Sequence, residues 1–127
     1  MTKSLFRISV SIGLLGMAIG IFMGIKQDFA LAPAHAHLNL LGFVTMFLSA
    51  LYYSVFPMAA ATRMARIQAV ISVGGAILFP VGIASVLLGG HDRLEPLVVA
   101  GALTVFVGML LFAVIVYRTA GMASGGE

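Results

Sequence analysis

The chain has no cysteine and very few charged residues. Without thiols it forms no disulfide, no iron–sulfur cluster and no thiolate metal site, so a bound metal needs histidine or carboxylate ligands. Only 9% of the 127 residues are charged, whereas ordinary soluble domains carry about 25%. A water-exposed surface cannot be built from so few charges. This composition is typical of membrane proteins.

The basic residues do not form a patch, although the net charge is +3 and the sequence pI is about 9.8. They occur singly at the ends of apolar runs, which indicates membrane topology and not a nucleic-acid surface. There is also no glycine-rich phosphate loop and no serine or cysteine motif with a paired base. Nucleic acid is therefore not an expected partner, and the sequence leaves open whether the chain is an enzyme.

Long apolar runs dominate the sequence, with 61% hydrophobic residues and a mean hydropathy of +1.15. A helix needs about 20 mostly apolar residues to cross the hydrocarbon core of a bilayer. Four stretches satisfy this condition, at residues 6–25, 34–56, 67–88 and 97–117. We therefore predict an all-α protein, a four-helix transmembrane bundle that forms one domain over residues 1–127.

The first apolar run has a second interpretation as a secretory signal. Lys3 and Arg7 precede it, and the Ala-Leu-Ala at 30–32 resembles a cleavage site. The run at 8–25 is longer than the usual signal core of about 7–15 residues, which favours a retained span. Glycines recur in it at every fourth position, either as a helix-packing ridge or as ordinary glycine enrichment: Gly16, Gly20 and Gly24.

Lysine and arginine are distributed unequally between the two sides of the predicted bundle. Five lie on the side of the termini, namely Lys3, Arg7, Arg63, Arg66 and Arg118, and two lie on the other, namely Lys26 and Arg93. The positive-inside rule then predicts that both termini are cytoplasmic, in a bacterial inner membrane. No ionisable residue falls in the middle of a span, which argues against a self-contained ion pump.

The most informative residues are two histidines at the outer end of the second span. His35 and His37 follow Pro33, which suits the first turn of a helix. Imidazoles inside a membrane need partners or a ligand. Positions two apart on an α-helix project roughly 200° apart, so the pair cannot chelate one metal and instead faces two compartments.

The helical period also predicts which residues share a face with each histidine. Asn39, Gly42 and Met46 follow His35 at i+4, i+7 and i+11, and Leu41 and Val44 follow His37 at i+4 and i+7. A flat iron macrocycle fits both faces, because imidazole is an axial ligand, glycine removes bulk and aliphatic side chains cover the ring. The alternative is that both imidazoles hydrogen-bond to neighbouring helices or to interfacial water.

The segment 34–57 resembles a haem-carrying helix of the catalytic subunit of haem-copper oxidases, most closely the C-type oxidases and nitric oxide reductases. The resemblance rests on the His35 and His37 pair, the small residues after it, the Tyr52-Tyr53 stretch and Pro57. It implies that His35 ligates an active-site haem and His37 a low-spin haem, on opposite faces of one helix. The expected cofactor is haem b, with His35 and His37 as the iron ligands.

The chain departs from that family in size and in ligand number. The family subunit has a twelve-helix, pseudo-threefold core, and this chain matches one four-helix arc of it, which suggests a homotrimer that rebuilds the ring. His35 of one copy would then face His37 of the next, with up to three haems. The family's copper site needs three further histidines, and only His91 remains here. Oxygen reduction at a haem-copper centre is therefore not expected of this chain alone.

These observations predict a membrane b-type haem protein for electron transfer or for binding a diatomic gas such as NO or O₂. A quinol or a cytochrome is the corresponding electron donor. Two alternatives stay open: a structural or assembly subunit of a respiratory membrane complex without haem, and a copper or zinc site held by histidines. The polar stretch His91-Asp92-Arg93 is most simply a solvated turn.

Overall fold

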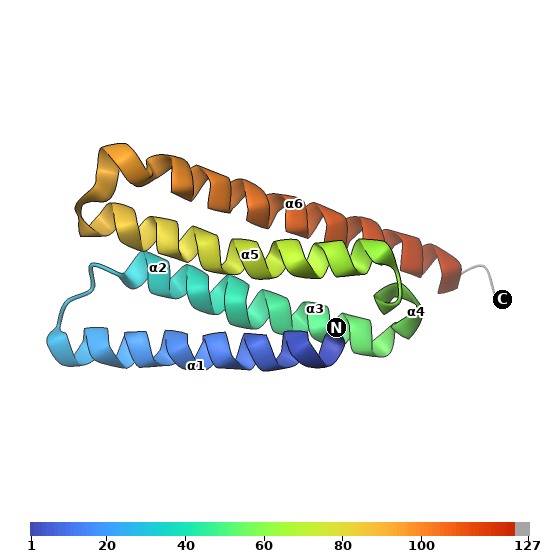
Figure 1. The fold of residues 1–127 in the computed structure, drawn as a ribbon. Coiled ribbons are helices and arrows are strands. Elements are labelled where there is room, and N and C mark those ends of the chain that lie inside the picture. The colour runs from blue at the N-terminus through green and yellow to red at the C-terminus, as the bar shows by residue number, and fades with distance from the viewer. Residues whose placement is uncertain (124–127) are drawn as a thin grey trace.

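A computed structural model describes the backbone of residues 1–123, and their side chains except those of 90–94 and 120–123. Over this stretch the chain is helical and contains no strand. The elements along the chain are α1 (Thr2–Lys26), α2 (Ala32–His37), the π-helix η1 (Leu38–Thr45), α3 (Met46–Val55), α4 (Pro57–Ala60), α5 (Arg63–Ser85), the π-helix η2 (Val86–Gly90) and α6 (His91–Ala123) (Figure 1).

Four helical stretches are long and apolar enough to cross a membrane, which confirms the four predicted spans. They are Thr2–Lys26, Ala32–Val55, Arg63–Gly89 and Glu95–Thr119. Between 17% and 28% of each span is buried inside the chain, so most of the apolar surface faces outwards. Exposing such a surface to water is unfavourable, whereas lipid tails accept it. The chain is an integral membrane protein whose helices contact the bilayer.

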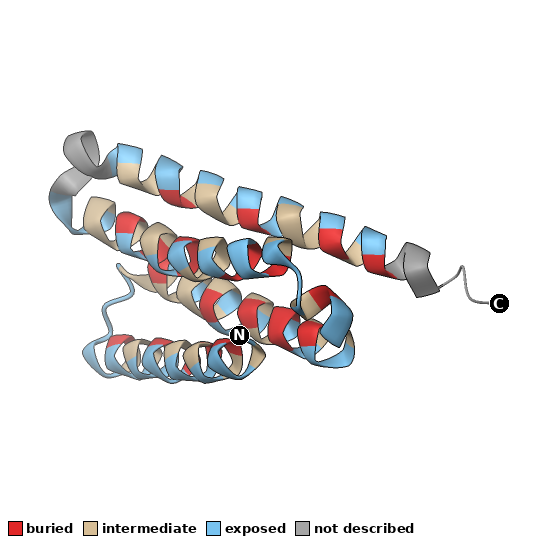
Figure 2. Ribbon diagram, turned by 45° about the vertical axis from the view of Figure 1, so that its right-hand side comes forward, coloured by how far each residue is buried: buried red, intermediate tan, exposed pale blue. Residues whose placement is uncertain are grey.

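The four spans lie side by side in chain order, as both ribbon views show (Figures 1 and 2). α1 packs on the second span, made of α2, η1 and α3; the second span packs on α5, and α5 packs on α6. The start of α1 and the last described turns of α6 lie at one end of the row, and α2, which contains His35 and His37, lies near the other (Figure 1). α1 and α6 form the two margins of this row, and large exposed apolar side chains such as Phe22 and Phe106 cover them.

The α5–α6 pair packs closely because glycines replace larger side chains at the contact. A Cβ atom on Gly101 would lie 2.6 Å from the Phe79 Cα, and one on Gly82 would lie 3.0 Å from the Val98 nitrogen. Small residues at such positions let membrane helices approach until their backbones touch, where dispersion forces act over the shortest distances.

The most completely buried side chains lie in the half of the bundle nearer the termini. Tyr53 and Met46 are each 1% exposed, and Gln68 is 2% exposed. Tyr53 packs edge-on against Phe112 of α6, with ring centroids 6.0 Å apart. The sequence analysis did not predict that α3, α5 and α6 meet at this tyrosine.

Candidate functional site

The turn between α1 and α2 brings the histidine pair back alongside the first span. α1 ends at Gln27, which adopts a left-handed conformation with φ 52°. The Asp28 carboxylate then accepts a hydrogen bond from the Ala30 amide at 3.0 Å. Pro33 lies in the first turn of α2, where a missing amide hydrogen costs nothing. α2 therefore starts directly before His35 and runs antiparallel to α1.

His35 points towards α1 and binds its backbone. Its Nδ1 lies 2.8 Å from the carbonyl oxygen of Gly16. A carbonyl oxygen only accepts hydrogen bonds, so Nδ1 carries the hydrogen and Nε2 keeps its lone pair. The Asn39 side-chain amide donates to the His35 backbone oxygen at 3.0 Å, and Gly20 leaves room for the ring. The imidazole is thus half-buried and fixed in one tautomer.

His37 is fixed in the same tautomer by a different carbonyl. Its Nδ1 lies 2.8 Å from the backbone oxygen of Pro33, one turn earlier in α2. Its ring packs edge-on against Phe79 of α5, with centroids 4.8 Å apart and an interplanar angle of 74°. Nδ1 therefore donates and Nε2 keeps its lone pair here too. The two rings face α1 and α5 respectively, as the two-residue spacing predicts.

The helix widens immediately after His37. Leu38–Thr45 forms a π-helix, in which the amide of residue i bonds the carbonyl of residue i−5. The prediction of shared faces assumed the tighter α-helical turn, and beyond His37 it is partly wrong for this reason. Leu41 and Met46 were expected on opposite faces, yet they line the same cavity. Asn39, which comes before most of the widened turn, does stay with His35 as expected.

Gly42 lies on the α1 side with His35 as expected, but neither Gly42 nor Val44 has the surroundings that were expected for a bound macrocycle. Gly42 is buried against α1, where a Cβ atom would collide with the Ile12 side chain. The glycine therefore allows close packing of the first two spans and does not leave an open gap. Val44 is 41% exposed on the outer surface of the bundle, available to lipid or to another copy of the chain.

An apolar cavity of about 370 Å³ lies beside His35, between α1, α2–η1 and α5, and it is open along one side. Its volume falls in the range of about 300–1,000 Å³ that is typical of small-molecule and cofactor sites. Among the described residues, His35 is the one ionisable side chain that lines it, and the remaining lining residues are Ile12, Leu15, Ile19, Leu31, Ala34, Leu38, Ile77, Pro80, Val81 and Ala84. The cavity therefore joins one imidazole to an aliphatic surface.

No group of three histidine or acidic side chains comes together among the side chains that the structure describes. His91, Asp92 and Arg93 lie outside those side chains. A copper or zinc site held by histidines from several copies of the chain stays a prediction.

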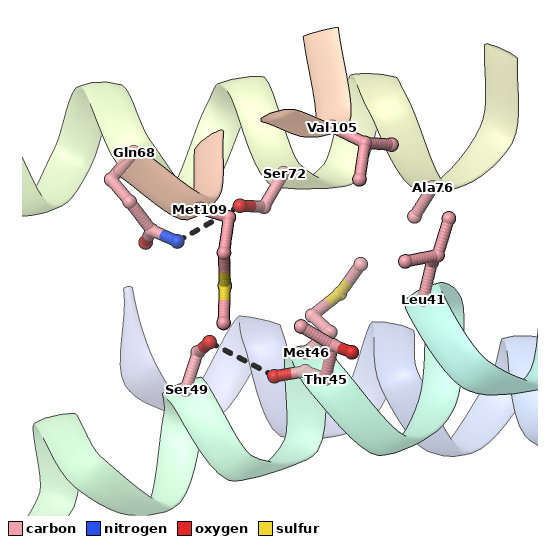
Figure 3. Close-up of a pocket in the computed structure, with 9 residues that line it drawn as sticks. All are labelled: Leu41, Thr45, Met46, Ser49, Gln68, Ser72, Ala76, Val105 and Met109. Atoms are coloured by element: carbon pink, nitrogen blue, oxygen red, sulfur yellow. Dashed lines mark hydrogen bonds between the residues drawn. The ribbon is translucent and has the colours of Figure 1, made fainter. Parts of the chain in front are cut away.

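A second cavity of about 170 Å³, mostly apolar but with a few polar side chains in its lining, was not predicted from the sequence (Figure 3). It lies between η1–α3, α5 and α6, and its polar lining residues are Thr45, Ser49, Gln68 and Ser72. The Tyr53 hydroxyl donates to Gln68 Oε1 at 2.9 Å, so Tyr53 belongs to the same network. One feature of the sequence could have indicated this cavity. Gln68 is the single carboxamide in a mostly apolar span, and Ser72 follows it one turn later.

The chain matches no protein-family model, no curated protein and no solved structure. The function is therefore argued from the site.

The histidines fit an axial haem ligand set on their own chemistry. Iron in haem proteins binds one imidazole nitrogen, while the other nitrogen donates to a carbonyl or carboxylate that orients the ring. In His35 and His37 alike, Nδ1 lies 2.8 Å from a backbone oxygen, which is the orienting contact of this arrangement.

Proposed function

We propose that this chain is a b-type haem-binding membrane protein, comparable to one four-helix repeat of the haem-copper oxidase catalytic subunit. His35 and His37 supply the axial imidazoles. The observation that carries the proposal is the matching pair of 2.8 Å contacts from the two Nδ1 atoms to backbone carbonyls, which leaves both Nε2 atoms available to a ligand.

The surroundings of His35 support the same proposal. A porphyrin has a large apolar surface, and the cavity beside His35 is bordered by aliphatic side chains such as Ile19, Leu38 and Val81. These residues exclude water from a bound ring, and a low local dielectric constant raises the cost of changing the iron charge, which tunes its potential.

Haem ligated from both sides requires more than one copy of the chain. Within one chain, His35 lies against α1 and His37 against Phe79 of α5, so the two rings do not face a common space. We propose a homotrimer in which His35 of one copy and His37 of the next ligate one iron, with up to three haems per trimer.

Bound haem supplies one-electron redox chemistry. Bis-imidazole ligation leaves no open position on iron, so electron transfer is the favoured role, with a quinol or a cytochrome as donor. Ligation by only one of the two histidines would leave a position for NO or O₂. The distribution of lysine and arginine orients the histidine end towards the outer face of a bacterial inner membrane.

Haem content tests the proposal, measured by the pyridine haemochrome assay on protein purified in mild detergent. We expect b-type haem in the wild type and less than half as much per chain in H35A and in H37A. H91A removes the third histidine and serves as the matched control, with unchanged haem. Haem-free wild-type protein, or equal haem in all four proteins, would refute the proposal.

The competing function is a structural subunit of a larger membrane complex. It is favoured by one observation: each imidazole already has a hydrogen-bond partner within its own chain. In that case, H35A and H37A lower the stability of the protein and its partner complex, and no b-type spectrum is found in the wild type.

A further inference from the structure

The cavity of Figure 3 is mostly apolar, but it has hydrogen-bonding groups on two facing walls. On the α5 wall, Gln68 Nε2 donates to Ser72 Oγ at 2.8 Å. On the η1–α3 wall, Ser49 Oγ donates to the Thr45 backbone oxygen at 2.9 Å, and Thr45 Oγ1 donates to the Leu40 oxygen at 2.9 Å. Each wall is bonded within itself, and the structure gives no direct bond between these two pairs of residues.

These hydrogen bonds use only part of the hydrogen-bonding capacity of the four polar side chains. A carboxamide nitrogen has two hydrogens, and the bonds among the described residues account for one on Gln68. The Ser72 hydroxyl accepts from Gln68 and still has its own hydrogen to donate. Across the cavity, Ser49 and Thr45 each donate and retain oxygen lone pairs. Donors on α5 therefore face acceptors on η1 and α3.

Every buried polar side-chain atom among the described residues already has one hydrogen-bond partner, so a molecule that bridges the walls adds to bonds already made. Gln68 is 2% exposed and Ser49 is 4% exposed, at a depth where lipid offers no hydrogen bonds. The apolar remainder of the lining consists of Leu41, Met46, Ala76, Val105 and Met109. It carries no charge, so the complementary ligand is neutral, small, and both donor and acceptor.

We propose that this cavity is an internal water site, which holds a small cluster of water molecules between Gln68 and Ser72 on one side and Ser49 and Thr45 on the other. The volume of about 170 Å³ exceeds the roughly 10–15 Å³ that one water needs, and polar groups on both walls supply the two to four partners that keep a buried water bound. It is smaller than the about 300 Å³ at which cofactor pockets begin.

The water cluster joins separate hydrogen-bonded pairs into one network. This network extends from the Tyr53 hydroxyl through Gln68 and Ser72 to Thr45 and the Leu40 carbonyl of the π-helix. The buried Tyr53 hydroxyl hydrogen thereby exchanges with internal water. The inference does not depend on haem, because none of these residues is a proposed iron ligand.

Solution NMR of the protein in deuterated detergent tests the site, with water as the probe. We expect cross peaks from water to the Gln68 side-chain amide hydrogens, and no xenon-induced shift of the Met46 and Met109 methyl groups at several atmospheres of xenon. Absent water cross peaks together with xenon shifts would show a dry cavity and overturn the proposal. In a second sample prepared in protonated detergent, cross peaks from the detergent chain to the same amide would overturn the proposal in favour of an acyl chain.

A cavity-filling variant provides the second measurement. Ala76 is 1% exposed in the cavity wall, so A76L fills the water space and is expected to abolish the water cross peaks. The matched control is T104A, because Thr104 bonds the Ala100 oxygen on an exposed face of α6 and does not line the cavity. Cross peaks that persist in a folded A76L would contradict the site, and the wild-type spectrum decides alone if A76L does not fold.

Discussion

The Gly16 carbonyl oxygen and the His35 Nδ1 lie 2.8 Å apart, although the residues are 19 positions apart in the chain. The first span therefore fixes which nitrogen of this imidazole is available to a ligand. The contact depends on glycine at two helix positions: a Cβ on Gly16 would collide with the Asn39 amide, and one on Gly20 would lie 2.8 Å from the His35 Cε1. The Gly16 carbonyl and the absence of side chains at Gly16 and Gly20 thus together determine the orientation of the His35 ring.

G20A is predicted to displace the His35 ring. The added methyl group cannot fit without moving the imidazole away from the Gly16 carbonyl, and overpacking of this kind costs about 1–3 kcal/mol. Thermal unfolding in detergent is the measurement. The matched control is G24A, because a Cβ on Gly24 meets nothing within 4 Å. It should be neutral or stabilise α1 by about 0.5–1 kcal/mol through helix propensity. Equal effects of the two substitutions would contradict the packing described.

G42A is predicted to destabilise the contact between the first two spans, and I12A is predicted to rescue it. The new Cβ collides with the Ile12 side chain, so the single variant should lose about 1–3 kcal/mol. Removing the Ile12 branch in the double variant opens space for the methyl group. A double-mutant cycle by thermal unfolding measures the coupling. Additive effects would mean that Gly42 and Ile12 are not in contact.

Tyr53 and Gln68 are predicted to be energetically coupled. Y53F leaves the Gln68 oxygen without the hydrogen bond that it accepts at 2.9 Å. Q68L removes both the acceptor of the Tyr53 hydroxyl and the donor to Ser72. Measured couplings between polar residues in membrane helices average about 0.6 kcal/mol and reach about 1.7, and burial of this pair places it in the upper part of that range. Y117F is the control, since Tyr117 is 80% exposed. A coupling of zero would refute the bond.

The proposed assembly predicts a trimer in detergent. Native mass spectrometry should give three times the chain mass of 13.3 kDa, with haem retained. Haem-dependent assembly is a further consequence, because each iron joins two copies: H37A should give fewer trimers than H91A. A monomer or dimer that carries two-sided haem ligation within one chain would contradict the proposed geometry.

The number of spans could be predicted from the sequence because lipid imposes both length and composition on a crossing helix. The opposite directions of His35 and His37 followed from the two-residue spacing, which lies at the start of the second span before the helix widens. The positions of Leu41 and Met46 could not be predicted in the same way. They depend on the π-helix from Leu38 to Thr45, and no residue type in that stretch distinguishes it from an α-helix.

The burial of Tyr53 also could not be predicted from the sequence. Its place near the end of the second span is typical of an interfacial aromatic residue. In the structure it is 1% exposed, because Gln68 of α5 and Phe112 of α6 surround it. A contact between three helices far apart in sequence is a property of their packing, so sequence periodicity within one helix does not contain it.

Low-temperature electron paramagnetic resonance of the oxidised protein tests the central claim most directly, because the ferric signal reports the axial ligands of the iron. We predict a low-spin bis-imidazole signal in the wild type and in H91A, and its loss or conversion to a high-spin signal in H35A and in H37A. A wild-type protein without a haem signal, or a low-spin signal that survives both substitutions, would contradict ligation by His35 and His37.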